Sequence, residues 1–321
     1  MKYGILGAGT HALRSHAIPG RDIPGIELVS LCDISEEQME KFEKKYQGRL
    51  QKFTEPRSFY DTVDAILIGS PDGSHFDQLE DAVNHGKHVF VEKPLGTTIA
   101  DVNKLKSVLQ DAKNNGLVVS SCHPRRFDPP FMWLKKNMPK YKLGNPIEFS
   151  FDFSYHRPSK LWKHDRGLLL DHVNHEIDLL HYLFGVQSFE ATRLVDKHDH
   201  YHVAGVRLDD LAFNFKGTRR LVSPSYPEWT TIRFDKGEIY MYAHRGFVRV
   251  HLHEAKAHHE IEIPPTDYDF RGRETLVNFL EAINNGIPCY LTHEDLYVNT
   301  ATAVMLSENR TYSYTKSSAS N

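Results

Sequence analysis

The amino-acid sequence predicts an α/β protein whose N-terminal part is a doubly wound parallel sheet and whose C-terminal part is an α+β domain with a mostly antiparallel sheet. Three observations support this prediction. Strand-like and helix-like segments alternate in the N-terminal part, a glycine-rich turn follows the first strand, and short strand-like segments follow one another closely in the C-terminal part. Because 321 residues are long for one hydrophobic core, we expect two domains, at 1–122 and 123–321.

Five apolar segments of the N-terminal part have the length and composition of buried parallel strands, at 2–6, 26–33, 63–70, 87–94 and 115–122. Helix formers fill the intervals at 35–47, 75–86 and 101–115. Ser35 is suited to cap the start of the first of these helices, and Gly86 is suited to end the second. Strands that alternate with helices predict right-handed βαβ units.

The C-terminal part begins with a helix predicted over 170–184. Six strand-like segments follow, separated in several places by turn signals such as DKGE and HRGF, at 189–195, 209–215, 218–223, 230–234, 238–243 and 247–253. Two more helices are expected at 273–285 and 294–310, and the tail at 317–321 is expected to be disordered. Strands at such short spacing predict an antiparallel sheet.

Composition argues against several classes of protein. The net charge is −3, so the basic surplus of a nucleic-acid binder is missing. No run approaches the roughly 18 apolar residues of a membrane span, and the N-terminus lacks the pattern of a signal peptide. The three cysteines, Cys32, Cys122 and Cys289, are far apart and odd in number, which favours a reducing compartment. We therefore expect a cytoplasmic protein with no nucleic-acid or membrane partner.

The turn after the first strand has the pattern Gly7-x-Gly9-x-x-Ala12. The first glycine permits a tight turn, the second lets the backbone approach a pyrophosphate, and a small third residue lets helix and strand pack closely. The helix that follows offers free N–H groups to a phosphate. The spacing therefore predicts a Rossmann dinucleotide-binding turn. The alternative is a glycine turn in a sheet that binds no nucleotide.

Asp33 ends the second strand, 24 residues after Gly9. This is close to the spacing of the acid that binds the ribose hydroxyls of a dinucleotide. A carboxylate there favours NAD over NADP, because it repels a 2′-phosphate, and neither Ile34 nor Ser35 brings a positive charge. The alternative role for Asp33 is to cap the helix that follows.

Four further motifs resemble one known family. IGSPDGSH at 68–75, HVFVEKPL at 88–95, Arg-Arg-Phe-Asp-Pro at 125–129 and the pattern D-x-x-x-H-x-x-D at 171–178 accompany the glycine turn. Together they resemble the Gfo/Idh/MocA family, the glucose-fructose oxidoreductase and inositol dehydrogenase group, over nearly the whole chain. The resemblance implies that Lys93 lies between nicotinamide and substrate, that the Lys93–Pro94 peptide is cis, and that the open face of the second domain's sheet forms dimers or tetramers.

The same resemblance suggests the residues of the site. Those implied for the cofactor come from the glycine turn, the end of the second strand, the two later motifs and a Trp-basic pair at 162–163: Gly7, Gly9, Thr10, His11, Ala12, Asp33, Ile34, Ser70, Pro71, His75, Glu92, Lys93 and Trp162. Those implied for the substrate are Lys93, Arg126, Asp171, Asn174 and His175. Trp162 could equally be an ordinary loop aromatic, and Arg126 an ion-paired surface residue.

The helix at 170–184 separates apolar from polar side chains. At about 100° per residue, Leu170, Val173, Ile177, Leu180 and Phe184 share one face. Asp171, Asn174, His175, Asp178 and Tyr182 share the opposite face. Asp171 and His175 are therefore neighbours at i and i+4, directed toward whatever lies across from the core.

This pair suits the oxidation of an alcohol. His175 can take the hydroxyl proton, because histidine titrates near neutral pH. Asp171 can orient it, and Lys93 can hold the oxygen and stabilise alkoxide charge. A metal site is less favoured, since HVNHE is neither H-E-x-x-H nor H-x-x-E-H. For His172 and His181 we expect solvated positions.

The sequence thus predicts an NAD(H)-dependent oxidoreductase, with NADP less favoured, acting on a ring hydroxyl or ketone of a sugar, sugar derivative or cyclitol. Lys93, Asp171 and His175 form the catalytic group, no metal is expected, and the chain is expected to form a homodimer or homotetramer. Two alternatives are a relative that retains NAD for glycoside cleavage or sugar–sugar oxidoreduction, and a non-catalytic nucleotide-binding regulator. The substrate stays open, because the family's Asp-x-Gly-x-His is here Asp171-His172-Val173-Asn174-His175. The histidine-rich runs at 197–202 and 251–259 are interpreted as surface or interface.

Overall fold

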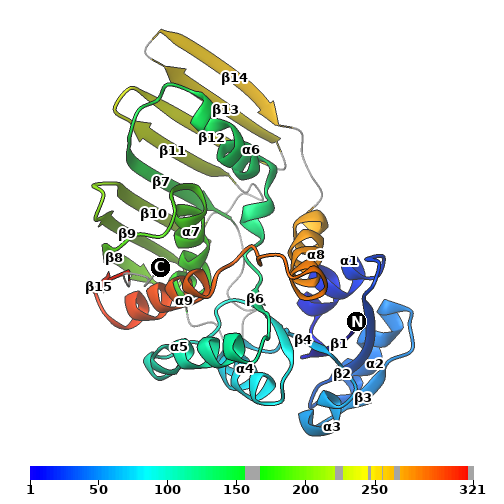
Figure 1. Ribbon diagram of the computed structural model, residues 1–321. Coiled ribbons are helices and arrows are strands. Elements are labelled where there is room, and N and C mark those ends of the chain that lie inside the picture. The colour runs from blue at the N-terminus through cyan, green and yellow to red at the C-terminus, as the bar shows by residue number, and fades with distance from the viewer. Residues whose placement is uncertain (156–166, 221–226, 245–246, 255, 264–267, 317–321) are drawn as a thin grey trace. The chain divides into compact units, whose positions relative to one another are not determined.

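A computed structural model describes residues 1–155, 167–220, 227–244, 247–254, 256–263 and 268–316 (Figure 1). The chain divides into two compact units, which are described separately below. The first unit contains Met1–Pro124 and Tyr268–Thr300, and the second contains Arg125–Asp267 and Ala301–Asn321. The predicted domain boundary between residues 122 and 123 stays a prediction. The first unit also contains Tyr268–Thr300, a segment that lies far from Met1–Pro124 in the sequence.

The first unit is built on a six-stranded sheet in the order β3-β2-β1-β4-β5-β6. All of its strand pairs are parallel, as predicted. The strands are β1 (Lys2–Leu6), β2 (Glu27–Cys32), β3 (Gln51–Phe53), β4 (Ala65–Ile68), β5 (His88–Val91) and β6 (Val119–Ser121). The order reverses at β1, so the topological switch point lies between β1 and β4, where α/β sheets bind their ligands.

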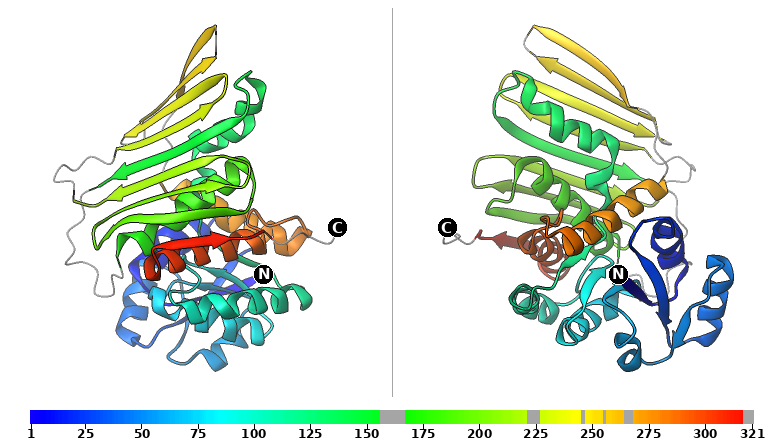
Figure 2. Two further views of the ribbon diagram at one scale, coloured as in Figure 1. Left: turned by 90° about the vertical axis from the view of Figure 1, so that its left-hand side faces the viewer. Right: turned by 45° about the vertical axis from the view of Figure 1, so that its right-hand side comes forward.

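Helices cover both faces of this sheet. They are α1 (Ile18–Gly20), α2 (Glu36–Tyr46), α3 (Pro56–Tyr60), α4 (His75–Asn84), α5 (Ile99–Asn114) and α8 (Tyr268–Asn285), with the π-helical turn η1 (Ala12–Ala17) and the 3₁₀ turn η2 (Asp72–Ser74). Along β5, Val89 and Val91 belong to the core under α4 and α5, whereas Phe90 belongs to the core under α2 and α8. Although α8 is far away in sequence, it packs beside η1 and α1 (Figure 2).

The second unit is built on a nine-stranded sheet in the order β14-β13-β12-β11-β7-β10-β9-β8-β15. Only the pair β7–β10 is parallel among the described strand pairs. The strands are β7 (Pro146–Ser154), β8 (Phe189–Lys197), β9 (His200–Arg207), β10 (Ala212–Thr218), β11 (Glu228–Phe234), β12 (Gly237–His244), β13 (Phe247–Glu254), β14 (Ala257–Ile263) and β15 (Thr311–Tyr314). The predicted mostly antiparallel sheet is confirmed.

One face of the nine-stranded sheet is covered by helices. The helical elements of this part are η3 (Pro124–Phe127), α6 (Pro129–Asn137), η4 (Met138–Lys140), α7 (Leu168–Phe184) and α9 (His293–Glu308), the last of which begins in the first unit and ends in the second. Phe149, Phe151 and Phe153 alternate along β7 and are buried on this face, where Phe151 meets Phe131 of α6. The other side is called the open face below.

Several elements differ from the sequence-based assignment. It missed the short strands β3 and β15, the helices α3 and α6, and the longer strands β7, β9 and β14. Phenylalanines alternate with other residues along β7, and this two-residue period could have identified the strand. In β9 and β14 the apolar alternation is weaker, because histidines occupy several of the positions. Of the predicted strand at 218–223, Thr218 is the last residue of β10, 219–220 lie after that strand, and 221–223 lie outside the described residues, as does the tail at 317–321.

Candidate functional site

Three strands of the first unit end at the same level. Leu6 of β1 pairs with Ile68 of β4, and Ile68 pairs with Val91 of β5. The backbone ladder continues one residue further, because the N–H of Gly69 donates to Leu6 O at 2.8 Å and the N–H of Glu92 donates to Ile68 O at 2.9 Å. The glycine turn and the two later motifs therefore leave the sheet side by side, at its carboxyl edge.

The two glycines of the turn have different surroundings. Gly7 has φ +98°, and a Cβ there would lie 2.6 Å from Ser70 Cα. A Cβ at Gly9 would meet only Gly69 O, at 3.9 Å, among the described atoms. Gly7 is thus required by the close passage of two strand ends. Gly9 instead leaves room over the backbone, which fits the approach of a pyrophosphate.

The Asp33 carboxylate is tied to this turn. Its Oδ2 accepts the N–H of Ala8 at 2.8 Å, and its Oδ1 accepts the N–H of Ser35 at 2.9 Å. Ser35 itself caps α2, as predicted, by accepting the N–H of Gln38 at 3.3 Å. Each carboxylate oxygen can accept a further bond, so Asp33 is able to bind ribose hydroxyls while it holds the turn.

His75 joins two loops of the carboxyl edge. Its Nδ1 lies 2.8 Å from Pro94 O and its Nε2 lies 2.9 Å from Ser70 O. The imidazole is buried, with only 2% of the residue exposed. The loop after β4 and the loop after β5 are therefore linked through this ring. The Lys93–Pro94 peptide in the second loop is cis, as predicted, and Lys93 is half-buried.

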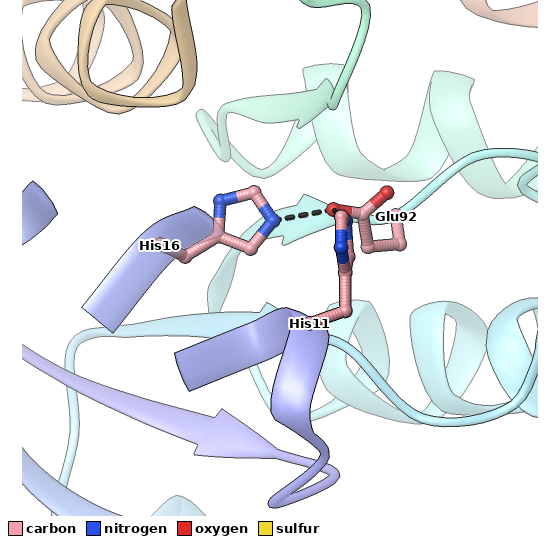
Figure 3. A group of neighbouring side chains, drawn as sticks. All are labelled: His11, His16 and Glu92. Atoms are coloured by element: carbon pink, nitrogen blue, oxygen red, sulfur yellow. Dashed lines mark hydrogen bonds and ion pairs between the residues drawn. The ribbon is translucent and has the colours of Figure 1, made fainter. Parts of the chain in front are cut away.

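A cluster of two histidines surrounds Glu92 (Figure 3). His11 Nε2 lies 3.1 Å from Glu92 Oε1, and His16 Nε2 is hydrogen-bonded to the same oxygen. His11 is exposed, whereas His16 and Glu92 are buried. Burial raises the pKa of Glu92, but the charges and hydrogen bonds of His11 and His16 outweigh it and hold the pKa well below its usual range. The carboxylate is therefore kept ionised inside the unit.

The local helix geometry makes this cluster possible. In an α-helix, side chains five residues apart point about 140° away from each other. His11 and His16 flank and occupy η1, whose π-helical winding repeats at i+5, so both rings reach Glu92. Their ligand atoms and that of Glu92 lie within 4.8 Å of one another, close enough to share a metal ion. The hydrogen bonds account for the same arrangement without one.

In the second unit, α7 carries the predicted acid and base. Its apolar stripe is buried as predicted, including Val173, Ile177 and Leu180. Asp171 and His175 are half-buried and lie one turn apart. The helix starts at Gly167, which has φ +102°, and the N–H of Leu168 donates to His198 O at 3.0 Å. The start of the helix, and with it Asp171, is thereby fixed to the end of β8.

Two other polar residues of α7 are more buried than predicted. Asn174 donates through Nδ2 to the carbonyls of Leu170 and Asp171, each at 3.2 Å, and is 1% exposed. Asp178 is fully buried and accepts from Arg126 Nε at 3.0 Å and from Arg126 Nη2 at 2.7 Å. Arg126 was predicted to bind the substrate. In the structure its guanidinium already forms this buried ion pair with Asp178.

The expectation that His172 and His181 are solvated is wrong. The ring of His172 stacks on Phe153 with 3.7 Å between centroids, and its Nδ1 lies 2.8 Å from Glu176 Oε1. Tyr201 donates its hydroxyl to the other oxygen of Glu176 at 2.9 Å. Burial, and then Glu176, raise the pKa of Tyr201 well above its usual range, so it stays a donor. His181 is 4% exposed. His181 is therefore buried and His172 half-buried, because α7 is covered around most of its circumference.

Comparison with known proteins gives two family matches. Residues 1–122 match the model described as an oxidoreductase family with an NAD-binding Rossmann fold, and residues 135–311 match the C-terminal α/β domain of the same family. The chain belongs to the Gfo/Idh/MocA oxidoreductase family. Residues 1–122 are therefore an NAD-binding Rossmann domain of that family, and the fold predicted for both parts of the chain is confirmed.

Relatives in the Gfo/Idh/MocA family include inositol dehydrogenases. The chain is 28% identical to scyllo-inositol 2-dehydrogenase (NAD(+)) of Bacillus subtilis over 171 residues, 51% of this chain and 48% of that one. It is 26% identical to myo-inositol 2-dehydrogenase of Thermotoga maritima, over 60% of this chain and 57% of that one. The chain spans about half the length of the curated relatives it matches.

Solved structures share the fold over nearly the whole length. An oxidoreductase from Agrobacterium radiobacter, in complex with NAD+, L-tartaric acid and magnesium, matches with a TM-score of 0.83 and 15% identity, covering 97% of this chain and 98% of that one. UDP-N-acetylglucosamine 3-dehydrogenase from Acidithiobacillus ferrooxidans matches with a TM-score of 0.78 and 17% identity, covering 96% and 97%. At such identities the likeness concerns the fold.

Some expectations lie beyond these observations. Trp162 falls outside the described residues. Within the helices that the structure describes, none combines the length and apolar character needed to cross a bilayer.

Sequence reasoning also missed three residues that shape the site, His16, Glu176 and Tyr201. A signal existed for Glu176, which is four residues after His172, but Tyr201 is reached only through the folded sheet.

Proposed function

We propose that the protein is an NAD(H)-dependent dehydrogenase that transfers hydride between nicotinamide and a ring hydroxyl or ketone of a sugar, sugar derivative or cyclitol. The observation that supports this most strongly is the common level at which β1, β4 and β5 end. It brings the glycine turn and Lys93 to one edge of one sheet. A dinucleotide bound on that turn would have its phosphates beside the loop that carries the lysine.

The cofactor is assigned to the carboxyl edge of the first unit. Gly7, Gly9 and the N–H groups of Thr10 to Ala12 would cradle the pyrophosphate, because the room over Gly9 is open. Asp33 would accept from the ribose hydroxyls, and the 94% exposed Ile34 offers an apolar surface for the adenine ring. A carboxylate at this position supports NAD over NADP. Ser70 and Pro71 would line the same edge.

The chemical roles follow from the side chains. When bound, the nicotinamide accepts or returns hydride. His175 takes the hydroxyl proton as hydride leaves the carbon and returns it in the reverse direction. Asp171, one turn earlier, orients the imidazole and stabilises its charged form. Lys93 holds the substrate oxygen with its ammonium and stabilises the alkoxide charge that develops there.

The substrate class is inferred from the chemistry and from the relatives. An acid/base histidine and a lysine suit a secondary alcohol that has further hydroxyl groups to orient it. The relatives named above act on inositols and on a nucleotide-linked amino sugar, as their names state. We assign a ring polyol to this chain on that support. The open face of the nine-stranded sheet, where Trp229 is 56% exposed, is the surface we assign to homodimer or homotetramer formation.

Formation of NADH tests this proposal. Purified protein would be incubated with NAD+ or NADP+ and a panel of inositols, aldoses, amino sugars and uronic acids, and absorbance would be followed. We expect turnover with NAD+ on at least one ring polyol. Lys93→Ala and His175→Ala should each lower kcat by about 100-fold or more.

Matched controls separate these roles from general damage. Lys113→Ala in the last turn of α5 and His85→Ala after α4 each remove an exposed side chain of the same type, at the helix ends that precede β6 and β5 and so at the amino edge of the sheet. Both should retain wild-type turnover. Turnover that survives loss of His175 would refute its assignment as the base. Absence of turnover on the whole panel, with NADH still bound through purification, would favour a retained-cofactor enzyme or a nucleotide-binding regulator instead.

A further inference from the structure

The edge of the nine-stranded sheet carries a cluster of metal-binding side chains. β13 and β14 form an antiparallel hairpin in which His253 pairs with His258 and His251 pairs with Glu260. Directly paired residues of an antiparallel sheet point to the same side, and residues two apart on one strand do too. All four side chains therefore gather on one face of the hairpin.

That face is the open face of the sheet. Leu252, between His251 and His253, is fully buried, and its neighbour Ile239 on β12 is buried with it. The four residues must point the other way. His258 and Glu260 are exposed, whereas His251 and His253 are half-buried. The cluster is therefore open to solutes in the described unit, and it lies on the two outermost strands, beyond Trp229 of β11, which marks the surface that we assign to oligomer formation.

The distances within the cluster suit a shared ion. The ligand atoms of His251, His258 and Glu260 all lie within 4.8 Å of one another. The Nδ1 atoms of His253 and His258 are 3.2 Å apart. Two nitrogens bound to one tetrahedral zinc ion at about 2.0–2.1 Å are about 3.3 Å apart, so the histidines already have nearly the required spacing.

The donor set selects the class of ion. Imidazole nitrogens bind Zn²⁺, Cu²⁺ and Ni²⁺ well, whereas Mg²⁺ and Ca²⁺ prefer oxygen ligands. One carboxylate with two imidazoles is a ligand set that zinc ions take in proteins. The hairpin register by itself brings the four side chains to one face, and a hydrogen-bonded imidazole pair accounts for the contact of His253 with His258; the metal site is inferred from the type and the spacing of the ligand atoms.

We propose that the β13–β14 hairpin binds a divalent transition-metal ion, with His251, His258 and Glu260 as ligands and His253 beside them as a further imidazole donor. The ion would join the outermost strand to its neighbour across the hairpin. β14 is an edge strand that pairs on one side only among the described strands, so such a link would stabilise the end of the sheet. The site is separate from the proposed dehydrogenase chemistry and does not depend on it.

Metal titration tests the proposal. The full chain, freed of any histidine tag and treated with a chelator, would be titrated with Zn²⁺ by calorimetry and with Co²⁺ by visible absorption, with Mg²⁺ as a control ion. We expect about one equivalent of Zn²⁺, tetrahedral Co²⁺ bands, and no binding of Mg²⁺ at the same concentrations. His258→Ala should weaken Zn²⁺ binding by about tenfold or more, since ligands matter at least as much as their supports.

A matched control lies next to the site. His259 is the following residue on β14, but it points to the opposite face. There its ring contacts the ring of Tyr141, and its Nε2 lies 3.4 Å from Glu254 Oε2. His259→Ala should bind Zn²⁺ as the wild type does. Equal losses in His258→Ala and His259→Ala would overturn the proposal. So would binding that survives His258→Ala and disappears in His11→Ala, because the ion would then belong to the Glu92 cluster.

Discussion

The two glycines of the turn after β1 should respond differently to substitution by alanine. At Gly7, φ is +98°, and a methyl group would lie 2.6 Å from Ser70 Cα and 2.7 Å from the carbonyl carbon of Gly69. These are backbone atoms at the end of a buried strand, which cannot move without cost. At Gly9, φ is outside the positive region, and the nearest described atom is Gly69 O at 3.9 Å. We expect Gly7→Ala to destabilise the fold and Gly9→Ala to weaken dinucleotide binding while leaving stability unchanged.

The magnitudes follow from these surroundings. Left-handed backbone costs an ordinary residue about 1–2 kcal/mol, and overpacking against fixed atoms adds about 1–3 kcal/mol. Gly7→Ala should therefore lower the free energy of unfolding by about 2–5 kcal/mol. At about 2–4 °C per kcal/mol, the melting temperature should fall by about 4–20 °C. Gly9→Ala should change stability by less than about 0.5 kcal/mol. Its affinity for NADH should fall by about tenfold, or about 1.4 kcal/mol.

Both properties can be measured on the same preparations. Circular dichroism gives the melting temperature without ligand, and NADH fluorescence gives the dissociation constant. If Gly9→Ala lowered the melting temperature as much as Gly7→Ala does, the room over Gly9 would not be open. If Gly9→Ala bound NADH as tightly as the wild type, the pyrophosphate would not approach the backbone there, and the assignment of the turn to the cofactor would be refuted.

Three further predictions concern charged side chains. Asp33→Asn should lower the preference for NAD+ over NADP+ in kcat/KM by about tenfold, because the repulsion of a 2′-phosphate is lost; an unchanged ratio would contradict the role of the carboxylate. Because the folded-state pKa of Glu92 lies below its usual range, Glu92 contributes stability above its unfolded pKa of roughly 4.3, and this is lost as the pH falls through the lowered value. Glu92→Gln should therefore reduce the loss of stability on acidification, measured by urea unfolding from neutral to acid pH, and an unchanged pH profile would count against the linkage. Arg126→Met should destabilise the chain by about 3–5 kcal/mol, because it leaves Asp178 buried without its partner, and Arg126→Met combined with Asp178→Leu should recover much of that loss; equal melting temperatures for single and double variants would argue against this account.

The sequence predicted the elements whose patterns are local. The parallel strands of the first unit are short apolar runs bounded by turns, and such runs identify buried strands without knowledge of their neighbours. The apolar stripe of α7 follows from its period in the same way. Asp171 and His175 could be placed together because a helix fixes the neighbours of each residue at i+4. Motif spacing also brought out Lys93 and Asp33.

What the sequence could not predict depends on contacts between distant elements. His16 reaches Glu92 only because η1 is wound as a π-helix, so a count at 100° per residue separates it from His11. The packing of α8 on the first unit joins segments far apart in sequence, which no local pattern indicates. The helical period of α7 assigns His172 and His181 to solvent, but α7 is covered on more than its apolar side, so His181 is buried and His172 is half-buried.

These contacts bear on the position of Lys93. The residue before it, Glu92, is held by its backbone N–H on Ile68 O and by its carboxylate on His11 and His16. The carbonyl of the residue after it, Pro94, contacts the buried ring of His75, which is also bound to the loop after β4. The residues before and after Lys93 are therefore fixed by histidine side chains. In the reaction that we propose, these histidines position the lysine and take no chemical role of their own. A catalytic ammonium needs this kind of support, because small displacements of a positioned group cost large factors in rate. Under the function that we propose, His11, His16 and His75 act as positioning residues for Lys93, and their effect on catalysis should depend on the presence of Lys93.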